Sequence, residues 1–201
     1  MVSFQVVIIC CLIIVRFTYS VDIPSVPLYN AAVEGTEMPV IGLGTGSYCG
    51  SGNSNISHPE CWNISSASQA TIDWFNLGGR RFDNADSYNA WQGVAAGLLQ
   101  LSSNWTKVNR SEIFLVSKTG PWKLMGYQDT IDQWKNIINT FQTEYVDLLL
   151  IHWPYDNSSK SYQSSDPYCN ANNSLYNVGL CIQDTWKAYE WIFNNGGAKA
   201  I

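Results

Sequence analysis

The sequence has few charged residues and very few histidines. Asp, Glu, Lys and Arg together make up 13% of the 201 residues, and two residues are histidine. The lysines and arginines form no cluster and the formal net charge is −5, so we expect neither nucleic acid nor an anionic membrane surface as a partner. Two histidines, with cysteines expected to pair as disulfides, also argue against a metal site. The sequence has no internal repeat, low-complexity tract or interdomain linker, which favours one domain over residues 21–201.

One apolar run stands at the start of the chain, at Val6–Val15. As a helix this run is too short to cross a bilayer. Thr18 and Ser20 supply small residues three positions and one position before a cut at Val21. The layout predicts a cleaved signal peptide over residues 1–20, and therefore no stable membrane association of the mature chain. No Lys or Arg precedes the run, so an uncleaved membrane anchor is the alternative.

Asparagines in glycosylation triplets support the secretory interpretation. Asn-X-Ser/Thr triplets without a central proline begin at Asn55, Asn63, Asn104, Asn109, Asn157 and Asn172. So many triplets in a chain of this length favour N-glycosylation. We therefore expect a secreted protein or one that resides in the lumen of the secretory pathway.

The predicted mature chain keeps an even number of cysteines: Cys49, Cys61, Cys169 and Cys181. In an oxidising compartment they allow three connectivities. The spacing favours Cys49–Cys61 and Cys169–Cys181, each of which closes a short loop and contributes about 3 kcal/mol. The alternative is a set of free, buried cysteines in a cytosolic protein.

Short apolar strands alternate with amphipathic helices along the chain. Strands are expected at residues 26–29, 38–41, 41–44, 80–85, 113–118, 145–153 and 198–201, the first two as a hairpin. Helices are expected at residues 68–77, 92–101, 129–143 and 184–195, with polar loops at 46–66 and 155–182. Residues 145–153 are apolar on both faces, as a parallel sheet covered by helices requires. The pattern predicts an α/β fold and leaves a doubly wound sheet and a (β/α)₈ barrel open.

Four polar residues follow or end the predicted strands: Asp83, Tyr88, Lys118 and His152. Active sites of parallel α/β folds assemble at the carboxyl ends of strands. A tyrosine beside a lysine and a carboxylate can protonate an oxyanion, and a histidine can orient a carbonyl group by hydrogen bonding. We expect Asp147, which faces away from His152, to support the structure.

Several segments resemble the aldo-keto reductase family. Gly78–Tyr88 (GGRRFDNADSY) resembles its signature around the catalytic Asp and Tyr, Phe114–Lys118 (FLVSK) its lysine strand, and Tyr145–Pro154 (YVDLLLIHWP) its histidine strand. Met38–Thr45 and Thr185–Glu190 are similar to its opening strand and to the helix before its fifth strand.

The resemblance implies a (β/α)₈ TIM barrel that uses NADPH to reduce an aldehyde or ketone to an alcohol. It implies that Tyr88 is the proton donor and that Lys118, paired with Asp83, lowers the pKa of this tyrosine. His152 would orient the small carbonyl substrate. The protein would be a monomer.

The resemblance also implies contacts to the ligands. Gly44, Thr45 and Asp83 would contact the nicotinamide end of the cofactor, and Trp153 would line the substrate pocket beside His152.

Departures from the family pattern limit what is inherited. Asn84 stands where relatives carry Ser or Thr, and Gly46 where many carry an aromatic residue.

The chain reaches only the start of a fifth strand at Ala198–Ile201, so we expect a truncated barrel and a fragment or incomplete product. On its own such a chain is expected to lack the cofactor groups of later strands. The alternatives are a non-catalytic, secreted binding protein of this family, and a glycoside hydrolase, for which no opposed pair of carboxylic groups is evident.

Overall fold

The computed structural model describes residues 22–46, 61–120, 125–153 and 164–201. The predicted signal peptide lies outside the described residues, as do Cys49, Asn55 and Asn157. Two strands form a small sheet, β1 (Ser25–Pro27) and β2 (Glu37–Pro39). The main sheet consists of β3 (Gly42–Gly44), β4 (Arg81–Asp83), β5 (Phe114–Thr119), β6 (Val146–Ile151) and β7 (Ala198–Ala200). The helices are α1 (Ile64–Asn76), α2 (Trp91–Ser102), α3 (Tyr127–Phe141) and α4 (Val178–Asn194), with a 3₁₀ turn at Arg110–Glu112.

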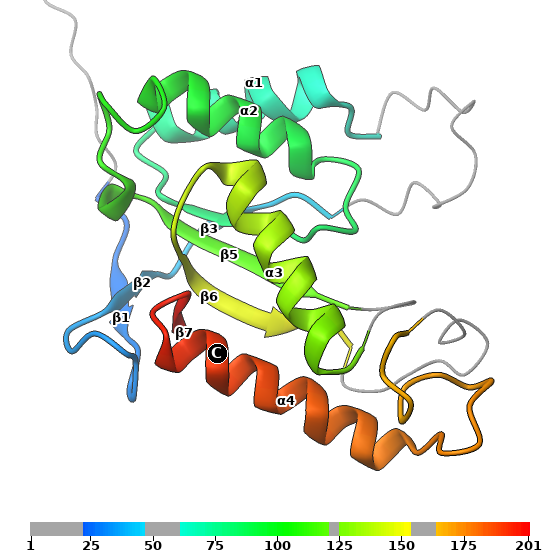
Figure 1. Ribbon diagram of the computed structural model, residues 1–201. Coiled ribbons are helices and arrows are strands. Elements are labelled where there is room, and N and C mark those ends of the chain that lie inside the picture. Colours follow the sequence, from blue (N-terminus) through cyan, green and yellow to red (C-terminus); the bar gives the residue numbers. More distant parts are fainter. Residues whose placement is uncertain (1–21, 47–60, 121–124, 154–163) are drawn as a thin grey trace, which may run out of the picture.

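The main sheet is parallel throughout, and its strands lie side by side in chain order from β3 to β7. A doubly wound sheet would reverse its strand order at a switch point. The unbroken order, with a helix before each of β4 to β7, is that of a (β/α)₈ barrel and covers its first five strands. Figure 1 shows the strands running in one direction between the helices.

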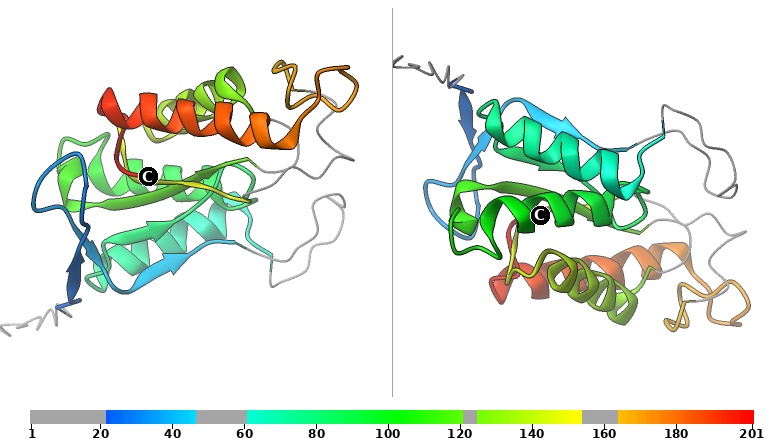
Figure 2. Two further views of the ribbon diagram at one scale, coloured as in Figure 1. Left: turned by 90° about the horizontal axis from the view of Figure 1, so that it is seen from below. Right: turned by 90° about the horizontal axis from the view of Figure 1, so that it is seen from above.

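The helices pack against one another in chain order and form an arc along one face of the sheet (Figure 2). The tightest approach is between α1 and α2, where two glycines of α2 face the backbone of α1. A Cβ added at Gly93 would lie 2.5 Å from the Ile64 carbonyl oxygen, and one at Gly97 would lie 2.7 Å from that of Ser68. The absence of side chains at these positions lets the two helices approach so closely.

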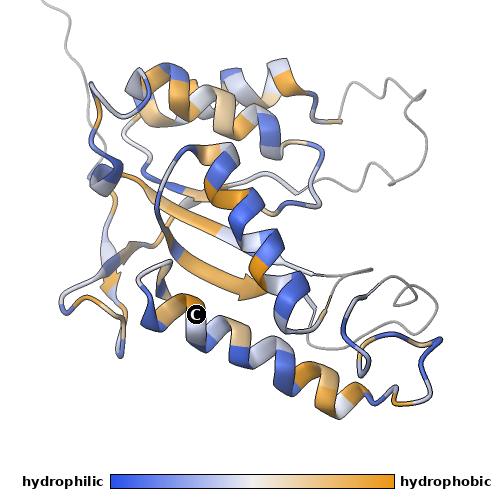
Figure 3. Ribbon diagram, in the orientation of Figure 1, coloured by the Kyte–Doolittle hydropathy of each residue, from blue (hydrophilic) through white to orange (hydrophobic). Residues whose placement is uncertain are grey.

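The core lies between the sheet and these helices. Phe82 of β4, Leu115 of β5 and Leu149 of β6 are fully buried there, against helix residues such as Leu98 and Ile137. Colouring by hydropathy shows β6 and most of β5 as apolar, whereas the helices carry polar residues on their outer sides (Figure 3). Apolar residues on both faces of β6 confirm the interpretation of residues 145–153 as a strand of a parallel sheet.

Two helices begin earlier than the sequence indicates, because an asparagine caps each. The Asn63 side-chain oxygen accepts from the backbone N–H of Ser66 at 2.9 Å, so α1 begins at Ile64 rather than residue 68. The Asn177 side chain accepts from the N–H of Leu180 at 3.1 Å, so α4 begins at Val178 rather than residue 184. The other strands and helices lie within about two residues of their predicted bounds.

The disulfide predicted at Cys169–Cys181 is present and fully buried, with 4.8 Å between the two Cα atoms. It fastens the loop after β6 to the first turn of α4. The other predicted pairing, Cys49–Cys61, involves a residue outside the described ranges. Within the described part of the chain, every helix is too short or too polar to span a bilayer.

The hairpin of β1 and β2 is antiparallel, as predicted, and lies at the amino ends of the strands. Its loop is held by a backbone hydrogen bond from the N–H of Ala32 to the carbonyl oxygen of Lys199 at 2.8 Å. The hairpin therefore closes one end of the sheet, and the opposite end carries the candidate site.

Candidate active site

Three strands and one turn bring together Asp83, Tyr88, Lys118 and His152, which we call the polar quartet. Asp83 is the last residue of β4, and Lys118 is next to last in β5. His152 directly follows β6, and Tyr88 lies in the turn between β4 and α2. All four residues lie at the carboxyl edge of the sheet, where barrel enzymes place their catalytic groups.

Lys118 is the centre of the polar quartet. Its ammonium nitrogen forms an ion pair with the Asp83 carboxylate. The same nitrogen donates to the Asn84 carbonyl oxygen at 3.1 Å and to the Tyr88 hydroxyl at 3.3 Å. The Lys118 side chain is 13% exposed and that of Asp83 is 40% exposed. The carboxylate therefore holds the ammonium group from the solvent side and leaves it against the phenol.

His152 completes the arrangement on the other side of the phenol. Its Nε2 lies 3.4 Å from the Tyr88 hydroxyl, and its Nδ1 lies 3.3 Å from the hydroxyl of Ser87. Burial, and secondarily the positive charge of Lys118, lower the pKa of His152 below its ordinary value. The imidazole is therefore neutral at pH 7, with one ring nitrogen as donor and the other as acceptor.

Aromatic contacts fix the orientation of the imidazole. The Tyr88 ring meets it edge-on with 5.3 Å between centroids, and Trp153 stacks on it at 6.1 Å with an interplanar angle of 16°. Trp153 is 47% exposed, so this indole presents an apolar surface beside the polar quartet. The phenol of Tyr88 thus lies between an ammonium group and a neutral imidazole, a geometry that supports proton transfer to an oxygen bound at the same point.

The positions predicted to contact a cofactor differ in accessibility. Gly44 is exposed at the end of β3, and a Cβ built there would meet nothing within 4 Å. Thr45 is only 2% exposed, and its hydroxyl donates to the Asp83 carbonyl oxygen at 2.9 Å. Thr45 therefore fastens the end of β3 to β4, and its contact with a cofactor stays a prediction. Gly44 and the side chain of Asp83 are therefore the accessible members of this set.

Asn84 is a neighbour whose importance the sequence does not reveal. It is fully buried, its side-chain oxygen lies 3.2 Å from the Thr45 hydroxyl, and its carbonyl oxygen accepts from Lys118. Its side-chain nitrogen has no hydrogen-bond partner among the described residues. The residue that departs from the family pattern thus supports both the lysine and the end of β3.

Asp86 and Ser87 are two further residues that sequence reasoning missed. Both lie in the turn after β4, and burial raises the pKa of Asp86 to about 6. Ser87 offers a hydroxyl to the imidazole of His152. The only sequence signal for either residue is its position between Asp83 and Tyr88.

Gly46 has a steric role in this site. A Cβ built at this residue would lie 3.1 Å from Cζ of Tyr88 and 3.3 Å from its hydroxyl oxygen. The ring of Tyr88 thus occupies the space that a larger side chain at this position would need. A side chain at residue 46 would therefore require the phenol or the backbone to shift by a few tenths of an ångström.

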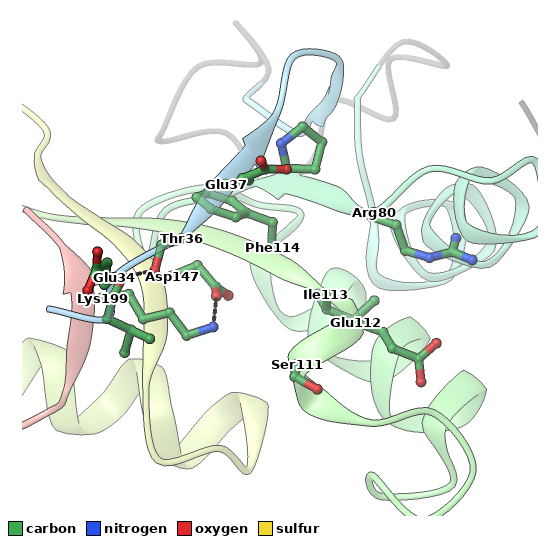
Figure 4. Close-up of a pocket in the computed structure, with 13 residues that line it drawn as sticks. Glu34, Thr36, Glu37, Arg80, Ser111, Glu112, Ile113, Phe114, Asp147 and Lys199 are labelled. Atoms are coloured by element: carbon green, nitrogen blue, oxygen red, sulfur yellow. Dashed lines mark hydrogen bonds and ion pairs between the residues drawn. The ribbon is translucent and has the colours of Figure 1, made fainter. Parts of the chain in front are cut away.

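A pocket at the opposite, amino edge of the sheet is separate from the polar quartet. It lies between the hairpin and the starts of the strands and has a volume of about 390 Å³ (Figure 4). One wall is the buried Asp147, which pairs with Arg110 and Lys199 at 2.8 Å each and accepts from the Leu115 N–H at 2.9 Å. Asp147 therefore has the structural role predicted for it.

No group of three or more potential metal ligands occurs among the described residues.

Comparison with known proteins identifies relatives of this chain. The model of the "Aldo/keto reductase family" matches residues 40–201. The NAD(P)H-dependent D-xylose reductase of Scheffersomyces stipitis is 27% identical over 184 residues, which cover 89% of this chain and 51% of that protein. The glyoxal reductase of Bacillus subtilis is 28% identical over 178 residues, or 88% of this chain and 48% of the relative.

A solved structure gives the same picture of the fold. The aldo-keto reductase of Bombyx mori, in complex with NADP, superposes with a TM-score of 0.64 at 23% identity. The match covers 89% of this chain and 49% of the Bombyx mori chain. This chain therefore spans about half the length of the relatives it matches and has the fold of the corresponding half.

Proposed function

This chain belongs to the aldo/keto reductase family, and from that premise we propose that it carries the proton-transfer centre of an NADPH-dependent carbonyl reductase. The reaction converts a small aldehyde or ketone to an alcohol. The observation that carries the proposal is the position of the Tyr88 hydroxyl, 3.3 Å from the Lys118 ammonium and 3.4 Å from Nε2 of His152.

Each member of the polar quartet has a distinct role in this proposal. Tyr88 donates its hydroxyl proton to the carbonyl oxygen of the substrate. The Lys118 ammonium stabilises the negative charge that the phenol oxygen then carries, and Asp83 holds this ammonium in place. His152, neutral because burial lowers its pKa, donates an N–H to the same carbonyl oxygen and fixes its direction.

The cofactor fits the open side of this centre. NADPH, when bound, supplies the hydride that the carbonyl carbon accepts. The chain offers the exposed Gly44 and the solvent-facing Asp83 at the end of β3 and β4. Because no side chain projects from Gly44, the nicotinamide ring can lie close to the backbone there. The NADP complex of the Bombyx mori relative supports the choice of cofactor.

Trp153, which stacks on His152, supports the proposed substrate class. Trp153 presents a half-exposed indole to the point where the carbonyl would bind, which suits a small, partly apolar aldehyde or ketone. Relatives named for D-xylose and glyoxal support a small carbonyl compound as substrate.

The proposal is tested on the protein that carries this chain. We expect it to quench NADPH fluorescence and to reduce 4-nitrobenzaldehyde. A folded protein that binds no NADPH would contradict the proposal and favour the alternative of a non-catalytic binding protein.

Substitution of the proton donor tests the assigned role. Tyr88→Phe should abolish turnover and leave NADPH binding intact, because only the hydroxyl is lost. Tyr127→Phe, at the first residue of α3 and 37% exposed, is the matched control and should keep full activity. Turnover that survives Tyr88→Phe would refute the role of Tyr88.

A further inference from the structure

The asparagines of the glycosylation triplets share one kind of position in the fold. The triplets within the described residues begin at Asn63, Asn104, Asn109 and Asn172, and all of these side chains are exposed. None lies in a strand or inside a helix: each is at a helix end or in a turn. The hydroxyl residues that complete the triplets, Ser65, Thr106, Ser111 and Ser174, are exposed too. A set of triplets that arose by chance would be expected to fall partly on buried or strand positions.

The disulfide is an independent observation that points to an oxidising compartment such as the lumen of the secretory pathway. Cys169 and Cys181 are bonded and fully buried, and Asn172 lies in the loop that this bond closes. Structural disulfides form in oxidising compartments and are rare in the cytosol. The compartment that forms this bond is also where N-glycans are attached.

We propose that this chain enters the secretory pathway and carries N-linked glycans on the side-chain nitrogens of Asn63, Asn104, Asn109 and Asn172. The co-reactant is a lipid-linked oligosaccharide diphosphate. The bond between C1 of its first sugar and the diphosphate oxygen breaks, and the lipid diphosphate leaves with the electron pair. A bond from C1 to Nδ2 of the asparagine forms, and Nδ2 loses one proton. The attached amide keeps one N–H and its carbonyl oxygen.

The geometry at Asn63 is compatible with this attachment. Its side-chain oxygen caps α1 by accepting from the Ser66 N–H at 2.9 Å, and its backbone N–H donates to the Ser66 hydroxyl at 3.0 Å. Glycosylation uses Nδ2, which makes no hydrogen bond to the described residues, and leaves the capping oxygen free to accept. A glycan at this residue therefore preserves the start of α1.

The other sites are equally open. Asn104 has the left-handed backbone φ of 56° in the turn after α2, a conformation that asparagine tolerates better than most residues. Asn109 precedes the 3₁₀ turn, and its backbone N–H donates to the Glu112 carboxylate at 2.9 Å. At Asn172 the backbone N–H is bound by the Asn170 side chain at 3.0 Å. The backbone N–H of Asn104 donates to the Leu99 carbonyl oxygen at 3.0 Å, and all of these asparagines are exposed.

The sites lie at both ends of the sheet. Asn63 and Asn172 belong to the connections that leave the carboxyl edge, the edge that also carries the polar quartet. Asn104 and Asn109 belong to the connection that enters β5 at the amino edge. None of these side chains hydrogen-bonds to the polar quartet within the described residues, so attachment of the glycans breaks no hydrogen bond of the quartet.

The test is expression of the whole chain in eukaryotic cells with a working secretory pathway. We expect a glycosidase that releases N-glycans to increase its mobility on a gel, and peptide mass spectra to show Asp in place of each released asparagine. Ser65→Ala, Thr106→Ala, Ser111→Ala and Ser174→Ala should each remove one glycan. A variant that loses no glycan overturns the corresponding site. Protease protection reports whether the chain is in the lumen: a luminal chain without glycans, or a chain confined to the cytosol, overturns the proposal.

Three further variants separate the glycan at Asn63 from its capping role. Ser66→Ala removes a capping partner and keeps the triplet, so the glycan should remain. Asn63→Asp removes the glycan and keeps a capping oxygen, whereas Asn63→Ala removes both, so its thermal midpoint should be lower than that of Asn63→Asp. Equal midpoints would show that the side-chain oxygen is not the capping group. None of these measurements depends on reductase activity.

Discussion

The ring of Tyr88 occupies the space above Gly46, where a Cβ would lie 3.1 Å from Cζ. Replacement of this glycine must therefore displace the phenol or the end of β3. We predict that Gly46→Ala lowers kcat roughly tenfold in the protein that carries this chain, because small displacements of a proton donor are costly. The KM for NADPH should change little. Steady-state kinetics separate the two constants, and an unchanged kcat would show that the neighbouring residues adjust without cost.

Asp86 is predicted to destabilise the fold at neutral pH. Burial raises its pKa from 3.8 to about 6, so between these values the folded chain binds more protons than the unfolded chain. Stability attributable to this group is then lost as the pH rises from about 4 to about 6. Asp86→Asn should raise the free energy of unfolding at pH 7 by about 1–2 kcal/mol, after allowance for partial solvent screening.

Urea unfolding of Asp86→Asn at pH 4 and pH 7 checks the predicted change in the free energy of unfolding. At pH 4 the carboxyl group is largely protonated in the folded chain, so the substitution should have little effect. Asp22→Asn, at an exposed residue before β1, is the control and should change stability little at either pH. An equal gain from Asp86→Asn at both pH values would rule out the titration as its cause.

The disulfide between Cys169 and Cys181 is predicted to stabilise the loop before α4. Replacement of both residues by serine should lower the free energy of unfolding by about 3 kcal/mol, because the open loop gains entropy in the unfolded chain. A thiol reductant should destabilise the unsubstituted chain by about 3 kcal/mol more than the double variant, because in the double variant only the predicted Cys49–Cys61 pair is left to reduce. Equal stability with and without reductant in the unsubstituted chain would contradict the prediction.

Asp147 is predicted to be a structural residue of the amino edge. Asp147→Asn leaves the cations of Arg110 and Lys199 without their buried counter-charge and should cost about 3 kcal/mol. Because the residue is remote from the polar quartet, NADPH binding by the folded variant should be unchanged. Asp132→Asn removes an exposed ion pair with Lys135 of 3.7 Å and should cost less than about 1 kcal/mol. Equal losses for the two variants in denaturant unfolding would refute the distinction.

The parallel sheet and the members of the polar quartet could be predicted from the sequence, because both depend on local signals. The apolar composition of Val146–Ile151 predicts a buried strand, and the histidine that follows it is a polar residue at the strand end. The early start of α4 could not be predicted. Gly179 disfavours a helix and follows a polar loop, and the helix start depends on a cap by the Asn177 side chain.

Other features depend on contacts between distant segments. The burial of Asp86 and of the Asn84 side-chain nitrogen, which has no hydrogen-bond partner among the described residues, arises only when the turn after β4 is packed. The hydrogen bond from the Thr45 hydroxyl to the Asp83 carbonyl oxygen requires both strand ends, and the predicted contact of Thr45 with the cofactor stays a prediction. Sequence patterns identify which residues meet at the strand ends, and packing decides which of them stay accessible.

The hydrogen bond between Ala32 and Lys199 has a consequence for the order of folding. It joins the loop of the first hairpin to β7, so one partner leaves the ribosome long before the other. Contacts between such remote segments form slowly, because a long loop must close first. The helices α1 and α2 can pair as they emerge, but the hairpin has to wait for β7 before it can dock. During translation the amino edge of the sheet therefore stays uncovered until β7 has emerged.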